Sequence, residues 1–226
     1  VLLGINQGWC WSTTVIMKID LAGPKRRGLA MGLNEAAGYL AVSASALAAG
    51  YLASTYALRP QPFFLGIVFV CAGLALSWFG VRESRDYTTL EATQMQQIEP
   101  ARAMEGSSAP PSFASVFAQT SWKNRTLFAV CQAGLVNNLN DGLSWGLFPL
   151  FFAATGLKTE QIGFLVAAYP AVWGVGQLAT GALSDRLGRK WLIVSGMLIQ
   201  AVGLLLILLV RTFWPWLAGA ALLGMG

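Results

Sequence analysis

The sequence contains no histidine and few charged residues. Only 11% of its 226 residues are Asp, Glu, Lys or Arg, whereas a soluble domain has about a quarter. Without histidine there is no His-based metal site, no His general base and no His proton relay. An H-E-x-x-H motif and a paired serine and base are also missing, so we expect neither an enzyme nor a bound metal or cofactor.

Cysteine is scarce as well, with three residues that lie in apolar stretches: Cys10, Cys71 and Cys131. Their spacing fits neither a disulfide framework nor a metal site. We interpret them as small, buried hydrophobic residues.

Long apolar runs, in contrast, are abundant, and 55% of the residues are hydrophobic. A helix that spans a bilayer takes about 20 mostly apolar residues. Runs of this kind cover residues 1–21, 29–52, 63–81, 126–152, 162–183 and 191–210, and a seventh begins at Trp216. The predicted fold class is an all-α, multi-pass membrane protein with about seven transmembrane helices, the last one truncated. Because the chain starts and stops inside apolar runs and has no initiating Met, we interpret it as a fragment of a longer protein.

Two of these runs differ in composition. Residues 29–52 are rich in Gly, Ala and Ser, which allow helix backbones to approach closely in lipid. Residues 63–81 carry large apolar side chains. We therefore expect the first run to pack between neighbouring helices and the second to face lipid.

The positions of Lys and Arg predict the orientation. Eleven of them lie in alternate connections, against three in the connections between, and cytoplasmic loops carry the excess. The net charge of +5 is scattered over these short connections, so we expect a lipid bilayer around the chain and no nucleic-acid partner. The cytoplasmic set is Lys25, Arg26, Arg27, Arg82, Arg85, Arg102, Lys123, Arg125, Arg186, Arg189 and Lys190, and the other set is Arg59, Lys158 and Arg211.

The most specific motif is G-A-L-S-D-R-L-G-R-K at residues 181–190, a charged segment between two apolar runs. We expect a sharp turn at the membrane surface, where Gly181 and Gly188 allow close approach of the helix ends and supply backbone freedom. Asp185 is placed to cap the next helix or to pair with a neighbouring cation. The cations of the motif are Arg186, Arg189 and Lys190.

A G-x-L-x-D-R-x-G-R-K pattern between two apolar helices resembles the loop motif of the major facilitator superfamily (MFS) of secondary transporters. The order of helices resembles that family from its fourth helix to the start of its tenth. This implies a partial MFS fold, in which residues 1–82 are the last three helices of the N-terminal half, 83–123 a cytoplasmic linker and 124–226 the first helices of the C-terminal half. It also implies that Gly181, Asp185, Arg186, Gly188, Arg189 and Lys190 form a cytoplasmic gating element and do not bind substrate.

Two patterns of the family are incomplete in this chain. Its R-x-x-Q-G string corresponds to residues 4–8, where Gly4 replaces the arginine. The G-x-x-x-G-P-x-x-G-G pattern of drug/proton antiporters corresponds to Gly28, Gly32 and Gly38, without the proline. Both differences weigh against a drug/proton antiporter and do not exclude one.

A charge inside a bilayer costs roughly 2.5 to 3.5 kcal/mol, so an intramembrane carboxylate needs a reason. Asp141 lies near the middle of the run at 126–152, and Asn137 and Ser144 share its helical face at i, i+3 and i+4 spacing. We expect this face, with Asn138 beside it, to bind the substrate or a coupling ion. The alternative is a polar patch hydrogen-bonded to neighbouring helices.

Three further candidates are weaker. Glu35 follows Asn34 in the small-residue run, near the predicted cytoplasmic end, where a structural ion pair or gate is favoured over direct cavity function. Gln7, in the first run, can add a neutral hydrogen bond or serve as a helix contact.

These features predict a secondary transporter that moves a small organic solute by alternating access, is coupled to protons and works as a monomer in a bacterial-type inner (plasma) membrane. No Arg or Lys lies centrally in any run to meet an anion, which favours neutral or cationic solutes. Trp145, Tyr169 and Trp173 offer stacking surfaces, with helix packing as the alternative. A drug-type efflux carrier and a non-transporting receptor or scaffold of the same fold remain the other hypotheses.

Overall fold

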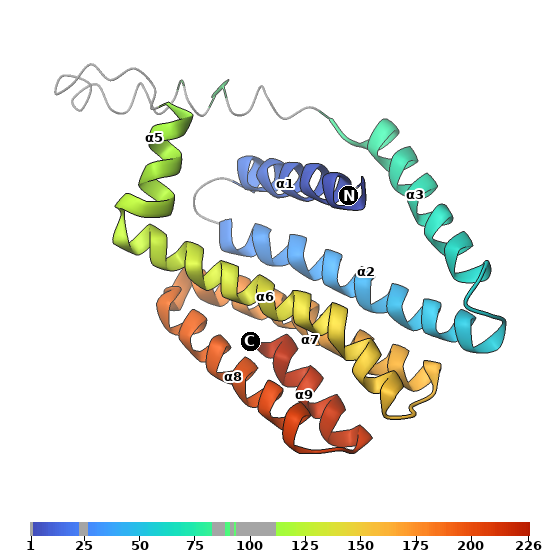
Figure 1. The fold of residues 1–226 in the computed structure, drawn as a ribbon. Coiled ribbons are helices and arrows are strands. Elements are labelled where there is room, and N and C mark those ends of the chain that lie inside the picture. The colour runs from blue at the N-terminus through green and yellow to red at the C-terminus, as the bar shows by residue number, and fades with distance from the viewer. Residues whose placement is uncertain (1, 23–26, 83–88, 91–92, 94–111) are drawn as a thin grey trace. The chain divides into compact units, whose positions relative to one another are not determined.

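The computed structural model describes residues 2–22, 27–82, 89, 90, 93 and 112–226, and no strand occurs among them (Figure 1). The elements in chain order are α1 (Leu2–Ala22), α2 (Arg27–Thr55), α3 (Gln61–Gly80), α5 (Phe113–Ala118), the π-helix η3 (Gln119–Lys123), α6 (Arg125–Ala154), α7 (Thr159–Leu187), α8 (Lys190–Leu209) and α9 (Phe213–Met225).

The chain forms two compact units. One consists of Val1–Arg82 together with Trp145–Gly226, and the other of Glu83–Ser144. Helix α6 crosses the boundary, so that its residues up to Ser144 belong to the second unit. The division into two helical halves joined by a linker at 83–123 remains a prediction.

Four helices in the described part of the chain are long and apolar enough to cross a membrane: Arg27–Thr55, Gln61–Gly80, Thr159–Ser184 and Lys190–Leu209. Helices α1 and α6 have 21 and 30 residues but carry polar side chains, and α9 is a shorter apolar helix of 13 residues. The fold is therefore all-α and multi-pass, as the sequence predicts.

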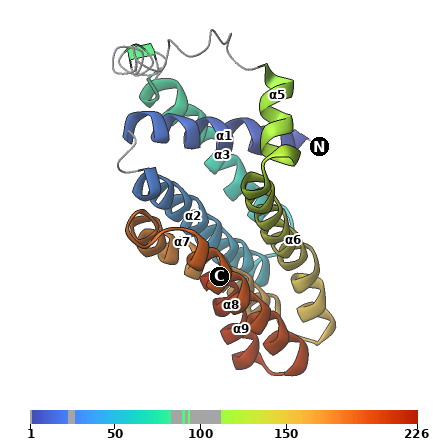
Figure 2. The same cartoon turned by 90° about the vertical axis from the view of Figure 1, so that its left-hand side faces the viewer.

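Helices α2 and α7 form a close antiparallel pair, and Figure 2 shows them side by side. Glycines make their contact possible. A Cβ atom on Gly32 would lie 2.5 Å from the Gln177 carbonyl oxygen and 3.1 Å from the Cα atom of Gly181, and one on Gly50 would lie 3.1 Å from the Cα atom of Gly163. Because no side chain separates them, the backbones approach as small residues allow in lipid. The expected close packing of residues 29–52 is confirmed.

Polar and aromatic side chains add to this interface. The buried Ser43 hydroxyl on α2 donates a 2.9 Å hydrogen bond to the Ala167 carbonyl on α7. Tyr39 stacks on Trp173 with ring centroids 4.0 Å apart and an angle of 13° between the planes. The rings of Trp11 on α1 and Tyr39 form a T-shaped pair with centroids 6.2 Å apart. Aromatic contacts therefore connect α1, α2 and α7.

Helix α3 shows the opposite pattern, because none of its residues is buried. Its exposed large side chains include Phe63, Trp78 and Phe79, which present the kind of apolar surface that lipid tails cover. The cysteines are exposed as well, so our interpretation of Cys10, Cys71 and Cys131 as buried residues is wrong. A small apolar side chain on a lipid-facing helix needs no protein around it.

The hydrophobic core of the first unit lies where the end of α6 meets α7, α8 and α9. Trp216 is its largest member, and its indole N–H donates a 3.2 Å hydrogen bond to the Ile207 carbonyl. A buried tryptophan with its polar atom satisfied anchors such a cluster. The buried members are Phe152, Leu165, Tyr169, Ile207, Trp216, Ala220 and Leu223.

Candidate functional site

The polar face predicted on α6 is largely buried. Asp141 and Ser144 are 5% and 4% exposed, and Asn137, one turn before Asp141, is half-buried. Their i, i+4 and i+7 spacing places the three side chains on one side of the helix. Arg125, at the first residue of α6, is the only Lys or Arg in that helix. The face therefore combines a carboxylate, an amide and a hydroxyl, and no Lys or Arg lies in the same part of the helix.

The Ser144 hydroxyl stands out because it is buried and has no hydrogen-bond partner within the described part of the chain. Other hydroxyls in helices bond to carbonyls of their own helix: Thr180 to Gly176 at 3.0 Å and Ser195 to Leu192 at 3.1 Å. A buried hydroxyl left unsatisfied costs about 1–3 kcal/mol. A ligand that hydrogen-bonds the Ser144 hydroxyl would recover that free energy.

Asn138 lies at the edge of this face of α6. It is exposed, and its side-chain amide donates a 3.0 Å hydrogen bond to the Gly134 carbonyl one turn back. Successive residues of a helix are about 100° apart, so Asn138 is turned away from Asn137, while its i, i+3 spacing keeps it beside Asp141. Its proposed role in binding is the weakest of the three.

Asn34 and Glu35 form a second group, on α2. Asn34 is 6% exposed, Glu35 is half-buried, and the Asn34 side chain hydrogen-bonds the Glu35 carboxylate. The positive charge of Lys18, on α1, acts on the same carboxylate. A lysine charge on the neighbouring helix favours the structural alternative for Glu35. Glu35 lies in the first compact unit and Asp141 in the second, so the two groups are separate candidates.

Gln7 is exposed on α1. In the preceding position, the Asn6 amide donates to the Cys10 sulfur of the same helix at 3.6 Å. The structure does not group Gln7 with either set of candidates.

The charged motif at residues 181–190 is mostly helix, not loop. Helix α7 continues to Leu187 and α8 begins at Lys190, so the turn is Gly188 and Arg189. Gly188 has a φ of +83° and a ψ of 167°, a conformation open almost only to glycine. Gly181 lies within α7, where a Cβ atom would come 2.7 Å from the Gly28 carbonyl oxygen of α2. The expected ten-residue loop is thus corrected to a two-residue turn, because the helix keeps its backbone bonds until glycine ends it.

The basic side chains of the motif are exposed. Arg186, Arg189 and Lys190 are exposed, and the Lys190 ammonium lies 5.5 Å from the centre of the Trp191 ring. The Asp185 side chain, and with it the expected pairing with these cations, lies outside what the structure describes.

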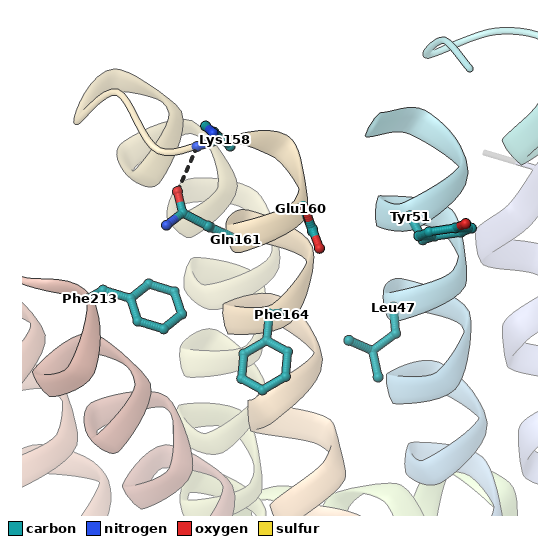
Figure 3. A pocket seen from close by; sticks show the side chains of 7 residues that line it. All are labelled: Leu47, Tyr51, Lys158, Glu160, Gln161, Phe164 and Phe213. Atoms are coloured by element: carbon teal, nitrogen blue, oxygen red, sulfur yellow. Dashed lines mark hydrogen bonds between the residues drawn. The ribbon is translucent and has the colours of Figure 1, made fainter. Parts of the chain in front are cut away.

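A pocket that the sequence did not indicate lies at the other ends of α2 and α7, with a volume of about 560 Å³. Figure 3 shows charged and aromatic side chains around it, and the Gln161 side chain accepts a 3.0 Å hydrogen bond from the Lys158 N–H. Lys158 and Glu160 were visible in the sequence as two charges before an apolar run, but no motif marks them. The lining residues are Leu47, Tyr51, Lys158, Glu160, Gln161, Phe164 and Phe213.

Two of the expected stacking surfaces are occupied by other rings. Trp173 stacks on Tyr39, and the buried Tyr169 lies 5.5 Å from Trp173. Trp145 is about half exposed. Among the described residues, no group of three or more His, Cys, Asp or Glu side chains is placed to hold a metal ion.

Comparison with known proteins gives two matches. A family model described as Major Facilitator Superfamily matches residues 1–138 and again residues 130–226. The inner membrane transport protein YajR of Escherichia coli (strain K12) is 32% identical over 108 residues, which are 48% of this chain and 23% of that protein. The match thus spans about a quarter of the relative's length. No solved structure matches the chain.

Proposed function

Because the chain belongs to the Major Facilitator Superfamily, we propose that it is part of a secondary active transporter that moves a small organic solute by alternating access. The relative from Escherichia coli is named an inner membrane transport protein, which supports the same activity and a bacterial-type inner membrane for this chain. We propose a monomer as the working unit.

The observation that carries the proposal is the buried polar face of α6. Asp141 is 5% exposed on a helix that contains no Lys and a single Arg, at its first residue. A carboxylate in such a position is expensive and marks substrate or ion pathways in membrane proteins. We propose that Asp141 carries the coupling proton and that Asn137 contacts the solute.

The arrangement of α2 and α7 supports a role for the charged motif as a gating element. On the proposed division, α2 belongs to the N-terminal half and α7 to the C-terminal half. Gly181, at the start of the motif, packs on Gly28 and Gly32 near the predicted cytoplasmic end of α2. Closure of that end would depend on this contact, because Gly181 and Gly32 meet backbone to backbone. The exposed Arg186, Arg189 and Lys190 then lie on the cytoplasmic surface of this gate.

A flux experiment tests this function. The intact protein is reconstituted into vesicles that contain a pH-sensitive dye, and a panel of neutral and cationic organic compounds is added with and without a pH gradient. At least one compound should accumulate only when the gradient is present, and the dye should report proton movement during its accumulation. The direction of the gradient that drives accumulation separates uptake from drug-type efflux. Accumulation independent of the gradient would contradict proton coupling, and a complete lack of flux would favour the non-transporting scaffold.

A further inference from the structure

The Ser144 hydroxyl is the one group of the α6 face whose hydrogen-bonding capacity is visibly unused. It is 4% exposed and has no partner in the described part of the chain, whereas Ser43, which is 6% exposed, donates to Ala167. Ser144 lies three residues after Asp141, so the carboxylate and the hydroxyl are neighbours along the same side of α6. A ligand that reaches Asp141 therefore reaches Ser144 as well.

We propose that Asp141 and Ser144 together bind the ammonium group of an amine-bearing solute. An ammonium group has three N–H donors and needs acceptors. Asp141 offers a buried negative charge, and Ser144 offers a hydroxyl oxygen that has no partner in the described part of the chain. This inference rests on the proposed function, because alternating access is what brings a solute to a buried face.

Other ligand classes fit this face less well. An anion would meet the Asp141 carboxylate without a Lys or Arg from the same part of α6. Hard metal cations such as calcium and magnesium surround themselves with about six or more oxygens, more than three side chains of one helix supply. A proton alone needs the carboxylate and leaves the Ser144 hydroxyl unused. An ammonium group uses both the charge of Asp141 and the hydroxyl of Ser144.

The test is equilibrium binding to the intact protein in detergent. Thermal unfolding is measured with methylammonium chloride, tetramethylammonium chloride or sodium chloride at the same pH and ionic strength. Methylammonium should raise the unfolding midpoint in a concentration-dependent way, because a ligand of the native state stabilises it. Tetramethylammonium, which has the same charge and no N–H donor, should not. Equal shifts with all three salts, a larger shift with sodium, or no shift with methylammonium would each overturn the proposal.

Variants of Asp141 and of the two buried serines make the test specific. Asp141→Asn should abolish the methylammonium shift, and Ser144→Ala should weaken methylammonium binding about tenfold, since a hydrogen bond to a charged ligand is lost. Ser144→Ala should not lower the midpoint without ligand, because the removed hydroxyl has no partner among the described residues. Ser43→Ala is the matched control and should lower the midpoint equally in all three salts. If Ser144→Ala binds methylammonium as the parent protein does, the proposal is wrong.

Binding and flux can fail independently. A protein that drives solute flux with a pH gradient but does not bind methylammonium overturns this inference alone. A protein that binds methylammonium but moves no compound of the panel overturns the proposed function alone.

Discussion

Ser43 on α2 and Ser144 on α6 are almost equally buried, yet only Ser43 has a hydrogen-bond partner among the described residues. Ser43 belongs to an interface in which glycines bring α2 and α7 into backbone contact and the buried hydroxyl bonds across to Ala167. Ser144 belongs to a face with a buried carboxylate, and its own hydroxyl has no hydrogen-bond partner among the residues that the structure describes.

This difference distinguishes a buried side chain that serves helix packing from one that serves ligand binding. Where two helices pack against each other, a buried polar atom is paired, because leaving it unpaired costs free energy. A buried polar atom that stays unpaired in a helix with carbonyls within its reach is better explained by a ligand. Helix α3 is the third case, with apolar side chains and no buried residue at all.

The largest effect is expected for Gly181→Ala in the α2–α7 interface. The new Cβ atom would lie 2.7 Å from the Gly28 carbonyl oxygen and 2.9 Å from the Cα atom of Gly32, so the backbones must move apart. Overpacking of this kind costs about 1–3 kcal/mol. Denaturant unfolding in mixed micelles should show the loss. Gly176→Ala, in the same helix but with no described atom within 4 Å of its Cβ, should be neutral or stabilising by up to about 1 kcal/mol. Equal effects of the two variants would refute the close contact.

The next effect is expected for Gly188→Ala at the turn between α7 and α8. With φ at +83° and ψ at 167°, an alanine is strained by about 1–3 kcal/mol although a Cβ atom meets no neighbour there. Gly73→Ala, in the open part of α3, controls for the substitution itself. A chemical-denaturation curve for each variant in the same detergent gives the comparison. Equal stability of both variants would mean that the turn does not require glycine.

The smallest effects are expected at the serines, and their signs should differ. Ser43→Ala should lower the free energy of unfolding by about 1 kcal/mol, because the Ala167 carbonyl loses its donor. Ser144→Ala should leave it unchanged or raise it slightly. Ser195→Ala, at an exposed hydroxyl that bonds within α8, serves as the reference in the same mixed-micelle titration. A loss at Ser144 as large as at Ser43 would show that Ser144 is a packing residue.

Composition predicted much of the fold. Small residues at 29–52 predicted a packed helix, and α2 is one. Large apolar residues at 63–81 predicted an outward-facing helix, and none of the residues of α3 is buried. The partner of α2 could not be predicted, because a contact between glycine backbones leaves no pattern of complementary side chains. Four described helices meet the length and composition of a membrane span, fewer than the seven runs, because polar residues dilute α1 and α6 and α9 is short.

The candidate site could be predicted only in part. Helical spacing placed Asn137 and Asp141 on one face with the exposed Asn138 at its edge, and a binding role for these residues stays a prediction. Charge suggested a loop at 181–190, whereas a helix tolerates charges at its end and stops at Gly188. The unpaired state of Ser144 depends on three-dimensional surroundings that no local pattern encodes.

The central claim, that the α6 face binds the coupling proton and the solute while the Ser43–Ala167 contact serves helix packing, is tested most directly by flux per folded molecule in Asp141→Asn and Ser43→Ala. Accumulation of a transported solute under a pH gradient is divided by the amount of folded protein in the same vesicles. We predict background flux for Asp141→Asn, because an amide cannot carry the proton, and parental flux per molecule for Ser43→Ala. Parental flux in Asp141→Asn would contradict the account.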